Sequence, residues 1–207
     1  GEVMNATGSP STSPPVGVQG EISVSADSVF ERITPEELWA CTSCKACDEI
    51  CPVNIEILDK ILGMRRYLTL MESNFPAELG NTYRSMENAG NAYGLNQGER
   101  GDWAASIDGV EIVDPGSPFE HEYLYFVGCA GSFDDRNKKT TQAFARVLQK
   151  AGVSFACLAK QELCNGETAR RLGNEYLYQK MAQVCVETVN AAPTKKALGN
   201  CPHCVNT

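Results

Sequence analysis

The chain has 207 residues, with 26 acidic and 18 basic side chains and a formal net charge of −8. This excess of negative charge disfavours nucleic acid and anionic membrane surfaces as partners. No apolar run approaches the roughly 20 residues that a membrane-spanning helix needs, and the first residues do not form a secretory signal peptide. We therefore expect no membrane span in this segment, and one large domain or two small ones.

Ten cysteines are many for a chain of this length. Secreted disulfide scaffolds are usually shorter and spread their cysteines at loop spacings. Here eight of the ten lie in CxxC-like clusters or directly after predicted strands. This distribution favours thiolates that bind metal in a reducing cytoplasm over a disulfide framework.

Residues 1–33 are predicted to be a linker or an extended segment, because residues 1–20 are rich in Ser, Pro and Gly. The sequence begins with Gly1 rather than a methionine, and it ends shortly after a CxxC pair. We therefore expect it to be part of a longer protein, with flanking domains that this segment lacks.

Residues 34–110 are predicted to form a small helical domain. The Thr-Pro-Glu-Glu motif at residues 34–37 has the pattern of an N-cap followed by a first helical turn. Asn54 is expected to cap a second helix, because apolar residues recur at helical spacing over residues 55–72. A third helix is expected to start at Pro76 and to end in a glycine-rich turn.

Residues 120–207 alternate between strand and helix patterns. We expect strands at residues 123–127, 153–158 and 195–199. Between them we expect a helix with the apolar stripe Thr140, Phe144, Val147 and Leu148, and a long helix at Glu167–Asn190. This βαβαβ order predicts a parallel sheet with right-handed crossovers. The boundary between the helical and the α/β domain is expected near residues 110–120.

Four cysteines and a proline form the run C-x2-C-x2-C-x3-C-P at residues 41–52. This is the bacterial ferredoxin spacing for a [4Fe–4S] cluster. Tight turns let three thiolates converge on one face of a cubane while backbone N–H groups point at its sulfides. A structural zinc site usually uses two separated CxxC pairs. The run therefore favours Cys41, Cys44 and Cys47 as ligands of iron.

The role of Cys51 stays open. In two-cluster ferredoxins, the fourth cysteine of such a run ligates the other cluster. No second CxxCxxC triplet occurs in the 207 residues. Cys51 therefore either closes the first cluster or serves a cluster whose other ligands lie in a longer protein.

A second group of cysteines follows the predicted strands. Cys129 follows the first strand, Cys164 the second, and Cys201 and Cys204 the third. The carboxyl ends of parallel strands share one edge of a sheet, where open α/β folds place their ligands. Helix N-termini at that edge stabilise an anionic cluster. The sequence therefore predicts a second metal site from these four cysteines.

This pattern resembles the cysteine-rich CCG domain of heterodisulfide reductase-type proteins. Members of that family have a cysteine, a long gap, Cys-Cys-Gly, a second long gap and CxxC. The gaps here are 34 residues (130–163) and 35 residues (166–200). The helical region before it is similar to the α-helical ferredoxin domain that precedes CCG domains in such chains.

The resemblance extends to a membrane-associated subgroup of iron–sulfur oxidoreductases linked with electron-transferring flavoprotein and quinone. The similar segments are residues 64–67, 87–91, 128–134 and 169–176. The resemblance covers residues 34–207. It implies an α-helical ferredoxin-like domain followed by a CCG-type α/β domain, [4Fe–4S] clusters, and a flavoprotein or another iron–sulfur subunit as redox partner. It also implies a cytoplasmic location, at the membrane face through the parent protein or a partner.

One departure concerns the second site. The family's Cys-Cys-Gly is Cys164-Asn165-Gly166 here, so one thiolate is lost. The full motif supplies five cysteines to a noncubane [4Fe–4S] cluster, whereas the remaining four suffice for an ordinary cubane. An uncharged amide is a poor iron ligand. We therefore expect a cubane or an otherwise altered cluster, with an empty or purely structural site as the alternative.

Other reactive side chains have simpler interpretations. Cys157 and Cys185 fall inside a predicted strand and helix, where each is expected to be a buried small hydrophobe. His203 lies between two predicted ligands, where it either donates a hydrogen bond to a cluster sulfide or faces solvent.

Two pairs of charged residues also allow simple interpretations. Arg65 and Arg66 are expected to face solvent, with a cluster or an acidic partner as the alternative. Asp134 and Asp135 are expected to cap the helix that follows the first strand.

Together these patterns predict the iron–sulfur electron-transfer component of a larger oxidoreductase. By resemblance, it would relay single electrons between a flavoprotein and a quinone, thiol or disulfide site. One alternative is a component of a heterodisulfide or thiol–disulfide reductase, which the loss of a thiolate at Asn165 disfavours. The second alternative is a zinc-stabilised interaction module. No catalytic residue is assigned, and the sequence contains no glycine-rich loop for a flavin or nicotinamide.

Overall fold

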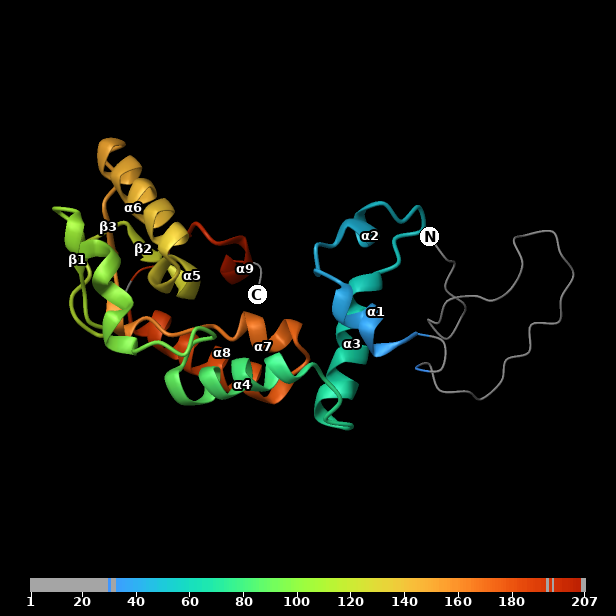
Figure 1. The fold of residues 1–207 in the computed structure, drawn as a ribbon. Coiled ribbons are helices and arrows are strands. Elements are labelled where there is room, and N and C mark those ends of the chain that lie inside the picture. Colours follow the sequence, from blue (N-terminus) through green and yellow to red (C-terminus); the bar gives the residue numbers. More distant parts are fainter. Residues whose placement is uncertain (1–29, 31–32, 193, 195, 206–207) are drawn as a thin grey trace, which may run out of the picture. The chain divides into compact units, whose positions relative to one another are not determined.

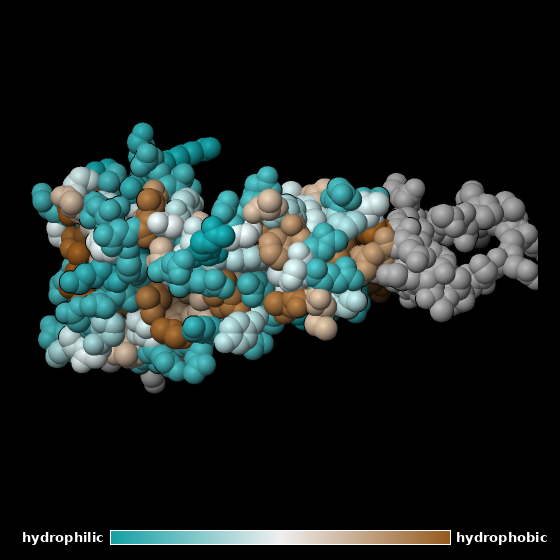
Figure 2. Space-filling view, turned by 60° about the horizontal axis from the view of Figure 1, so that its bottom comes forward, coloured by the Kyte–Doolittle hydropathy of each residue, from teal (hydrophilic) through white to brown (hydrophobic). Residues whose placement is uncertain are grey.

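The structure, a computed structural model, describes residues 30, 33–192, 194 and 196–205 (Figure 1). The predicted extended segment at residues 1–33 therefore lies almost entirely outside the described residues. The chain divides into two compact units, Gly1–Phe75 and Pro76–Thr207. None of the helices in the described ranges is long and apolar enough to cross a membrane. On the face drawn in Figure 2, hydrophilic residues predominate and hydrophobic ones appear in small separate areas.

In the described part of the first unit, the α-helices are α1 (Pro35–Ala40), α2 (Ala46–Glu49) and α3 (Ile57–Leu70). α1 starts where the sequence predicts. The Thr34 side chain accepts a hydrogen bond from the Glu37 N–H at 3.4 Å, and the Glu37 carboxylate accepts one from the Thr34 N–H at 2.8 Å. This reciprocal capping box satisfies two backbone donors that the first turn would otherwise leave free.

The start of α3 differs from the prediction. Asn54 has a φ of 54° and lies outside the helix, so it is not the cap. Asp48, in the cysteine run, instead accepts a hydrogen bond from the backbone N–H of Leu58 at 2.9 Å. The long-range cap fixes the cysteine run against the first turn of the helix.

A small apolar core joins α1 and α3. Its buried members are Ile33, Leu38 and Leu68. Arg65 is also buried on α3, at 3% exposure, so the expectation that it faces solvent is wrong. The neighbouring Arg66 is exposed, as predicted.

The second unit begins with α4 (Ala77–Ala89), which follows Pro76 as predicted. The helix ends at Gly90, whose φ of 68° is in the left-handed region that glycine adopts at low cost. A 3-10 helix, η2 (Gln97–Ser106), comes next.

α4 and η2 pack with the α/β part of the chain. The Tyr83 hydroxyl donates a hydrogen bond to the carbonyl oxygen of Leu172 at 2.6 Å. Trp103 is 1% exposed and lies in the core against the sheet. The two compact units therefore divide the chain before α4. The domain boundary expected near residues 110–120 stays a prediction.

The sheet has four parallel strands in the order β1-β3-β2-β4, so the predicted parallel sheet is confirmed. The strands are β1 (Glu111–Ile112), β2 (Tyr123–Phe126), β3 (Phe155–Cys157) and β4 (Ala197–Gly199). Leu124 aligns with Ala156 on one side and with Ala197 on the other. β1 was not predicted, because its two exposed residues form no apolar run. Lys195, the predicted start of the last strand, lies outside the described residues.

Helices and 3-10 turns follow the strands at their carboxyl ends. They are α5 (Gly128–Phe133) and α6 (Asp135–Lys150) after β2, η3 (Ala159–Gln161), α7 (Glu167–Arg171) and α8 (Glu175–Ala191) after β3, and α9 (Pro202–Val205) after β4. The two faces of the sheet carry separate cores. Tyr125 and Phe155 pack with residues of η2 and α6, whereas Leu124 and Ala156 pack with residues of α8 and its C-terminal end. The alternation follows from the two-residue period of a strand.

α6 begins at the predicted cap. The carboxylate of Asp134 accepts a hydrogen bond from the Asn137 N–H at 2.8 Å. The buried stripe is shifted from the prediction, because Thr141, rather than Thr140, faces the core, and Val147 is 60% exposed.

The long helix predicted at Glu167–Asn190 is two helices, α7 and α8. Gly173 has a φ of 83°, which ends α7. Asn174 then caps α8 by accepting a hydrogen bond from the Leu177 N–H at 3.1 Å. A glycine in the left-handed conformation followed by an Asn cap separates two helices that the apolar spacing alone joins.

Candidate metal centres

The first cysteine run lies between α1 and α3 and contains the short helix α2. Ser43 and Lys45 have φ values of 58° and 63°, which fold the run into two tight turns. The Ser43 N–H donates to the Cys41 sulfur at 3.4 Å, and the Ile55 N–H donates to the Cys51 sulfur at 3.3 Å. Backbone donors directed at sulfur stabilise the thiolate form, which is the form that binds metal.

The buried Arg65 side chain supports the cysteine run through hydrogen bonds. Its guanidinium donates to the carbonyl oxygens of Leu38 at 2.6 Å and of Cys41 at 2.5 Å, and to the Ser43 hydroxyl at 3.4 Å. It also lies 5.1 Å from the ring centre of Trp39. One buried cation therefore fixes the backbone of the first predicted ligand and the turn that follows it.

Asp48 links the third predicted ligand to α3. Its Oδ1 accepts hydrogen bonds from the Leu58 N–H at 2.9 Å and from the Cys47 thiol at 3.5 Å. The Leu58 hydrogen bond lowers the pKa of Asp48, and burial together with the Asp48 carboxylate raises the pKa of Cys47. The pKa of Cys44 is lowered by the hydrogen bond from the Ala46 N–H.

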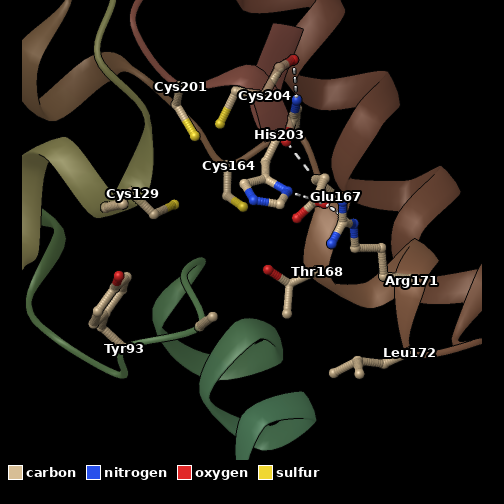
Figure 3. Close-up of a pocket in the computed structure, with 13 residues that line it drawn as sticks. Tyr93, Cys129, Cys164, Glu167, Thr168, Arg171, Leu172, Cys201, His203 and Cys204 are labelled. Atoms are coloured by element: carbon tan, nitrogen blue, oxygen red, sulfur yellow. Dashed lines mark hydrogen bonds and ion pairs between the residues drawn. The ribbon is translucent and has the colours of Figure 1, made fainter. Parts of the chain in front are cut away.

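The second site is a single cavity of about 360 Å³, lined by Cys129, Cys164, Cys201 and Cys204 (Figure 3). Cys129 lies in the first turn of α5, and Cys164 follows η3. Cys201 directly precedes α9, which contains Cys204. The structure thus brings together at the carboxyl edge of the sheet the four cysteines that the sequence places after three strands. The volume lies in the lower part of the range of about 300–1,000 Å³ for small-ligand and cofactor sites.

The thiols of this site differ in their tendency to ionise. A hydrogen bond from Cys164, followed by the charge and hydrogen bond of Arg100, lowers the pKa of Cys129 to about 7. The same hydrogen bond and burial raise the pKa of Cys164. Burial and the neighbouring Cys201 raise the pKa of Cys204. Of Cys129, Cys164 and Cys204, Cys129 is therefore the thiol most ready to bind a metal at neutral pH.

A buried ion pair, Arg100 and Glu162, contacts Cys129 and the backbone before it. Arg100 and Glu162 are 1% and 2% exposed, and the Arg100 Nη2 lies 2.7 Å from the Glu162 Oε1. The Arg100 Nη1 donates to the Cys129 sulfur at 3.5 Å. Glu162 accepts hydrogen bonds from the backbone N–H groups of Val127 at 2.7 Å and Gly128 at 2.8 Å.

This ion pair was not predicted from the sequence. The available signal was weak, since Glu162 is an acidic residue two positions before Cys164, and Arg100 lies in a polar segment without a motif.

Asn165, where the family has its second cysteine, is fully engaged in local structure. Its Nδ2 donates to the carbonyl oxygen of Cys204 at 2.9 Å, and its Oδ1 accepts from the Glu167 N–H at 3.2 Å. The side chain thus ties the loop after Cys164 to α9 and starts α7. With both polar atoms occupied by the protein, Asn165 acts as a brace rather than as a spare ligand.

Gly128 is required by a close approach. Its φ is 77°, and a Cβ at this position would lie 2.9 Å from the Cys204 sulfur. A side chain here would both strain the backbone and push the Cys204 thiol.

The wall of the cavity away from the cysteines was not predicted. It includes Tyr93, Thr168 and Leu172. At the rim, His203 is 51% exposed, and its Nδ1 lies 3.1 Å from a carboxylate oxygen of Glu167. Figure 3 shows the four sulfur atoms and the Thr168 side chain directed into the same space.

The donors of this site fit a negatively charged iron–sulfur cluster. Four thiols face one cavity, and a guanidinium donates to one of the sulfurs. Among the described residues, no three Cys, His, Asp or Glu side chains lie close enough to hold one metal ion. Each thiolate of a cubane binds a different iron, so four separate thiols that face one cavity suit such a cluster.

Cys157 and Cys185 lie outside the cavity and are 0% and 5% exposed. Their thiols donate to the carbonyl oxygens of Glu111 at 3.7 Å and Leu163 at 3.6 Å. Burial raises the pKa of Cys157 to about 12 and that of Cys185 to about 11. Both are buried small side chains, in agreement with the prediction.

Comparisons with known proteins agree with this division of the cysteines. Residues 123–207 match the CCG family, described as a cysteine-rich domain, and residues 2–55 match a 4Fe-4S dicluster domain. The predicted [4Fe–4S] cofactor is thereby confirmed. The second match also includes residues 2–33, which we predicted to be an extended segment.

Three relatives illustrate the similarity. The chain is 41% identical over 177 residues to an EtfAB:quinone oxidoreductase of Syntrophomonas wolfei (84% of this chain, 25% of the relative). It is 41% identical over 182 residues to the probable iron–sulfur-binding oxidoreductase FadF of Bacillus subtilis (86% and 26%). It is 26% identical over 193 residues to one component of the dihydromethanophenazine:CoB–CoM heterodisulfide reductase of Methanosarcina barkeri (84% and 43%). The chain spans about a quarter of the length of the first two, and no solved structure matches it.

Proposed function

We propose that this chain, which belongs to the iron–sulfur oxidoreductases with a cysteine-rich CCG domain, relays single electrons as the iron–sulfur part of a larger protein. The observation that carries the proposal is the meeting of Cys129, Cys164, Cys201 and Cys204, from three strand ends, in one cavity. Four thiols gathered from segments far apart in sequence are a ligand set, since a structural role alone would not require their convergence.

The first cluster is assigned to Cys41, Cys44 and Cys47 in an α-helical ferredoxin-like domain. The match to a dicluster domain supports this assignment. It also favours the interpretation in which Cys51 ligates a second cluster outside this chain. The Ile55 N–H that donates to the Cys51 sulfur at 3.3 Å prepares that thiol for either role.

Partners and location are inferred from the relatives. The printed name of one relative joins EtfAB with quinone, and another is called a probable membrane-anchored ferredoxin. We infer that a flavoprotein donates electrons to this chain and that a quinone or a thiol/disulfide site accepts them. The parent protein or a partner would then hold the chain at the cytoplasmic face of the membrane.

The chain's own residues set the conditions for this transfer. A bound [4Fe–4S] cluster supplies the change of one electron. Around the second site, the pKa of Cys129 is lowered to about 7 and Arg100 donates to its sulfur. Gly128 leaves room for the Cys204 thiol, and Asn165 holds the backbone of Cys204. Such contacts control the potential and the orientation of ligands.

Iron, acid-labile sulfide and zinc should be measured per chain on protein purified without oxygen. Two four-iron clusters predict about eight irons with matching sulfide. Cys44→Ser and Cys129→Ser should each remove about four irons. Cys185→Ala is the matched control, because Cys185 is a buried cysteine outside both sites. Zinc without sulfide would contradict the proposal.

A second candidate function is a thiol–disulfide or heterodisulfide reductase. The cavity favours it, because its wall at Tyr93, Thr168 and Leu172 leaves a side free of predicted ligands. This candidate predicts that a disulfide oxidises the reduced clusters and is cleaved to two thiols, taking two electrons from the clusters and two protons from solvent. An unchanged cluster spectrum after addition of the disulfide would exclude the reductase and leave electron transfer as the proposed function.

A further inference from the structure

Arg100 and Glu162 form an ion pair where solvent does not reach. The two side chains are 1% and 2% exposed, and the Arg100 Nε has no hydrogen-bond partner among the described residues. Burying two charges costs free energy that their attraction often does not recover, and replacing such pairs by apolar residues is frequently neutral or stabilising. Stability alone is therefore a poor explanation for the pair.

The pair is positioned by the two segments that carry Cys129 and Cys164. Glu162 lies two residues before Cys164, and it accepts hydrogen bonds from the backbone of Val127 and Gly128, directly before Cys129. In turn, the Glu162 Oε1 holds the Arg100 guanidinium at 2.7 Å, so that its other arm reaches the Cys129 sulfur at 3.5 Å.

We propose that Arg100 is a positioning residue that raises the reduction potential of the cluster at the second site through its hydrogen bond to the Cys129 sulfur, and that Glu162 holds it there. This inference rests on the proposed function, because it requires a cluster bound by Cys129. Reduction adds negative charge to the cluster, and a cation that donates to a ligand sulfur stabilises the reduced state more than the oxidised state.

The two members of the pair act on the potential with opposite signs. The Glu162 carboxylate is a negative charge near the same cluster, so it disfavours the added electron. Removal of the Arg100 charge should lower the potential, and removal of the Glu162 charge should raise it. Low local polarity strengthens both effects, because neither side chain is screened by solvent. A purely structural pair would not produce shifts of opposite sign.

The test is a redox titration of the cluster-loaded chain, followed by electron paramagnetic resonance. Cys129→Ser identifies the signal of the second site. Arg100→Gln should lower the reduction potential of that signal by about 59 mV, which corresponds to a tenfold change in the one-electron equilibrium constant. Glu162→Gln should raise it, because the amide oxygen of glutamine can still accept the hydrogen bond from Arg100 while the negative charge is lost. The matched controls are Arg146→Gln on α6 and Glu187→Gln on α8, which remove the same charges from exposed positions.

Each outcome decides the inference. Opposite shifts in the two variants support it, whereas unchanged potentials, or shifts of the same sign, overturn it. If Arg100→Gln loses the second-site iron, Arg100→Lys should restore the iron and Glu162→Gln should still raise the potential. Failure of both would overturn the inference. If no iron in the unaltered chain depends on Cys129, the second cluster of the proposed function is wrong instead.

Discussion

The guanidinium of Arg65 donates to the carbonyl oxygen of Cys41 at 2.5 Å, across 24 positions of the chain. The same side chain donates to the carbonyl oxygen of Leu38 from two nitrogens, at 2.6 and 3.0 Å. The backbone of Cys41, a proposed ligand, is thus held in place by the protein itself. The first site is preorganised by a residue that ligates nothing, and the second site has a counterpart in Glu162, which holds the backbone before Cys129.

Arg65→Met should destabilise the first unit and lower its iron content. The variant removes the Arg65 donor from the carbonyl oxygen of Cys41 and leaves that of Leu38 only the Cys41 N–H at 3.4 Å. An unpaired buried acceptor costs about 1–3 kcal/mol. We expect the free energy of unfolding to fall by about 2–4 kcal/mol, measured by denaturant titration, with loss of iron from the first site. Arg66→Met, at the exposed neighbouring position, is the control. Equal effects of the two variants would refute the bracing role of Arg65.

Local patterns explain why much of the fold was predictable. The capping box at Thr34, the helix between Pro76 and Gly90, and the cap at Asp134 depend on residues a few positions apart. The strand positions followed from short apolar runs, and parallel pairing then required the ends of these strands to share an edge. For that reason, the convergence of Cys129 and Cys164 could be predicted from the order of elements alone.

The features that were missed depend on partners far away in sequence. Asp48 caps α3 from ten residues before Leu58, and Arg100 reaches Cys129 and Glu162 across 29 and 62 positions. A charged residue gives no sequence signal of its own burial, because the groups that satisfy it belong to other elements. The packing of Trp103 against the sheet, which places η2 in the second unit, is of the same kind.

Gly128→Ala should reduce the iron content of the second site. The added Cβ would lie 2.9 Å from the Cys204 sulfur, in addition to the strain of a φ of 77°. Gly152→Ala is a matched control, because Gly152 has a φ of 69° but no atom within 4 Å of its added Cβ. Both variants should lose about 1 kcal/mol of stability from backbone strain. Only Gly128→Ala should lower second-site iron, and equal iron contents would count against the predicted role of Cys204.

Asp134→Ala should lower the melting temperature by a few degrees in a pH-dependent way. The hydrogen bond from the Asn137 N–H lowers the pKa of Asp134 in the folded chain. Its contribution is therefore present above the unfolded pKa and is lost as the pH falls through the lower folded pKa. The difference in melting temperature should be largest near neutral pH and should shrink below about pH 4. Asp135→Ala, at a 97% exposed position, should show a smaller effect at every pH.

A fragment that begins at Pro76 should unfold cooperatively, whereas one that begins at Glu111 should not. The shorter fragment loses the Trp103 side chain from the core and the Arg100 partner of Glu162. Loss of a buried tryptophan alone costs about 3–5 kcal/mol. Thermal unfolding followed by circular dichroism would compare the two fragments. Equal unfolding transitions of the two fragments would instead favour the domain boundary predicted near residues 110–120.

Asn165→Asp should weaken the hydrogen-bonded link between the loop after Cys164 and α9. An aspartate still accepts from the Glu167 N–H, but it cannot donate to the carbonyl oxygen of Cys204, which it would repel. The loss should reduce the free energy of unfolding by about 1–3 kcal/mol, together with the iron that depends on Cys129. Asn190→Asp makes the same chemical change at an exposed position on α8 and should have no such effect.

Asn165→Cys tests the same role from the other side. It restores the Cys-Cys-Gly of the family, but it removes both hydrogen bonds of the amide, to the carbonyl oxygen of Cys204 at 2.9 Å and from the Glu167 N–H at 3.2 Å. If the amide is a brace, the variant should melt at a lower temperature and hold no more iron per chain than the unaltered protein. If the variant instead binds additional iron without loss of stability, the site accepts a fifth thiolate and Asn165 is no brace. Additional iron would mean that the substitution changed the cluster itself. A lower melting temperature without additional iron would mean that it weakened the structure that holds the four unaltered cysteines.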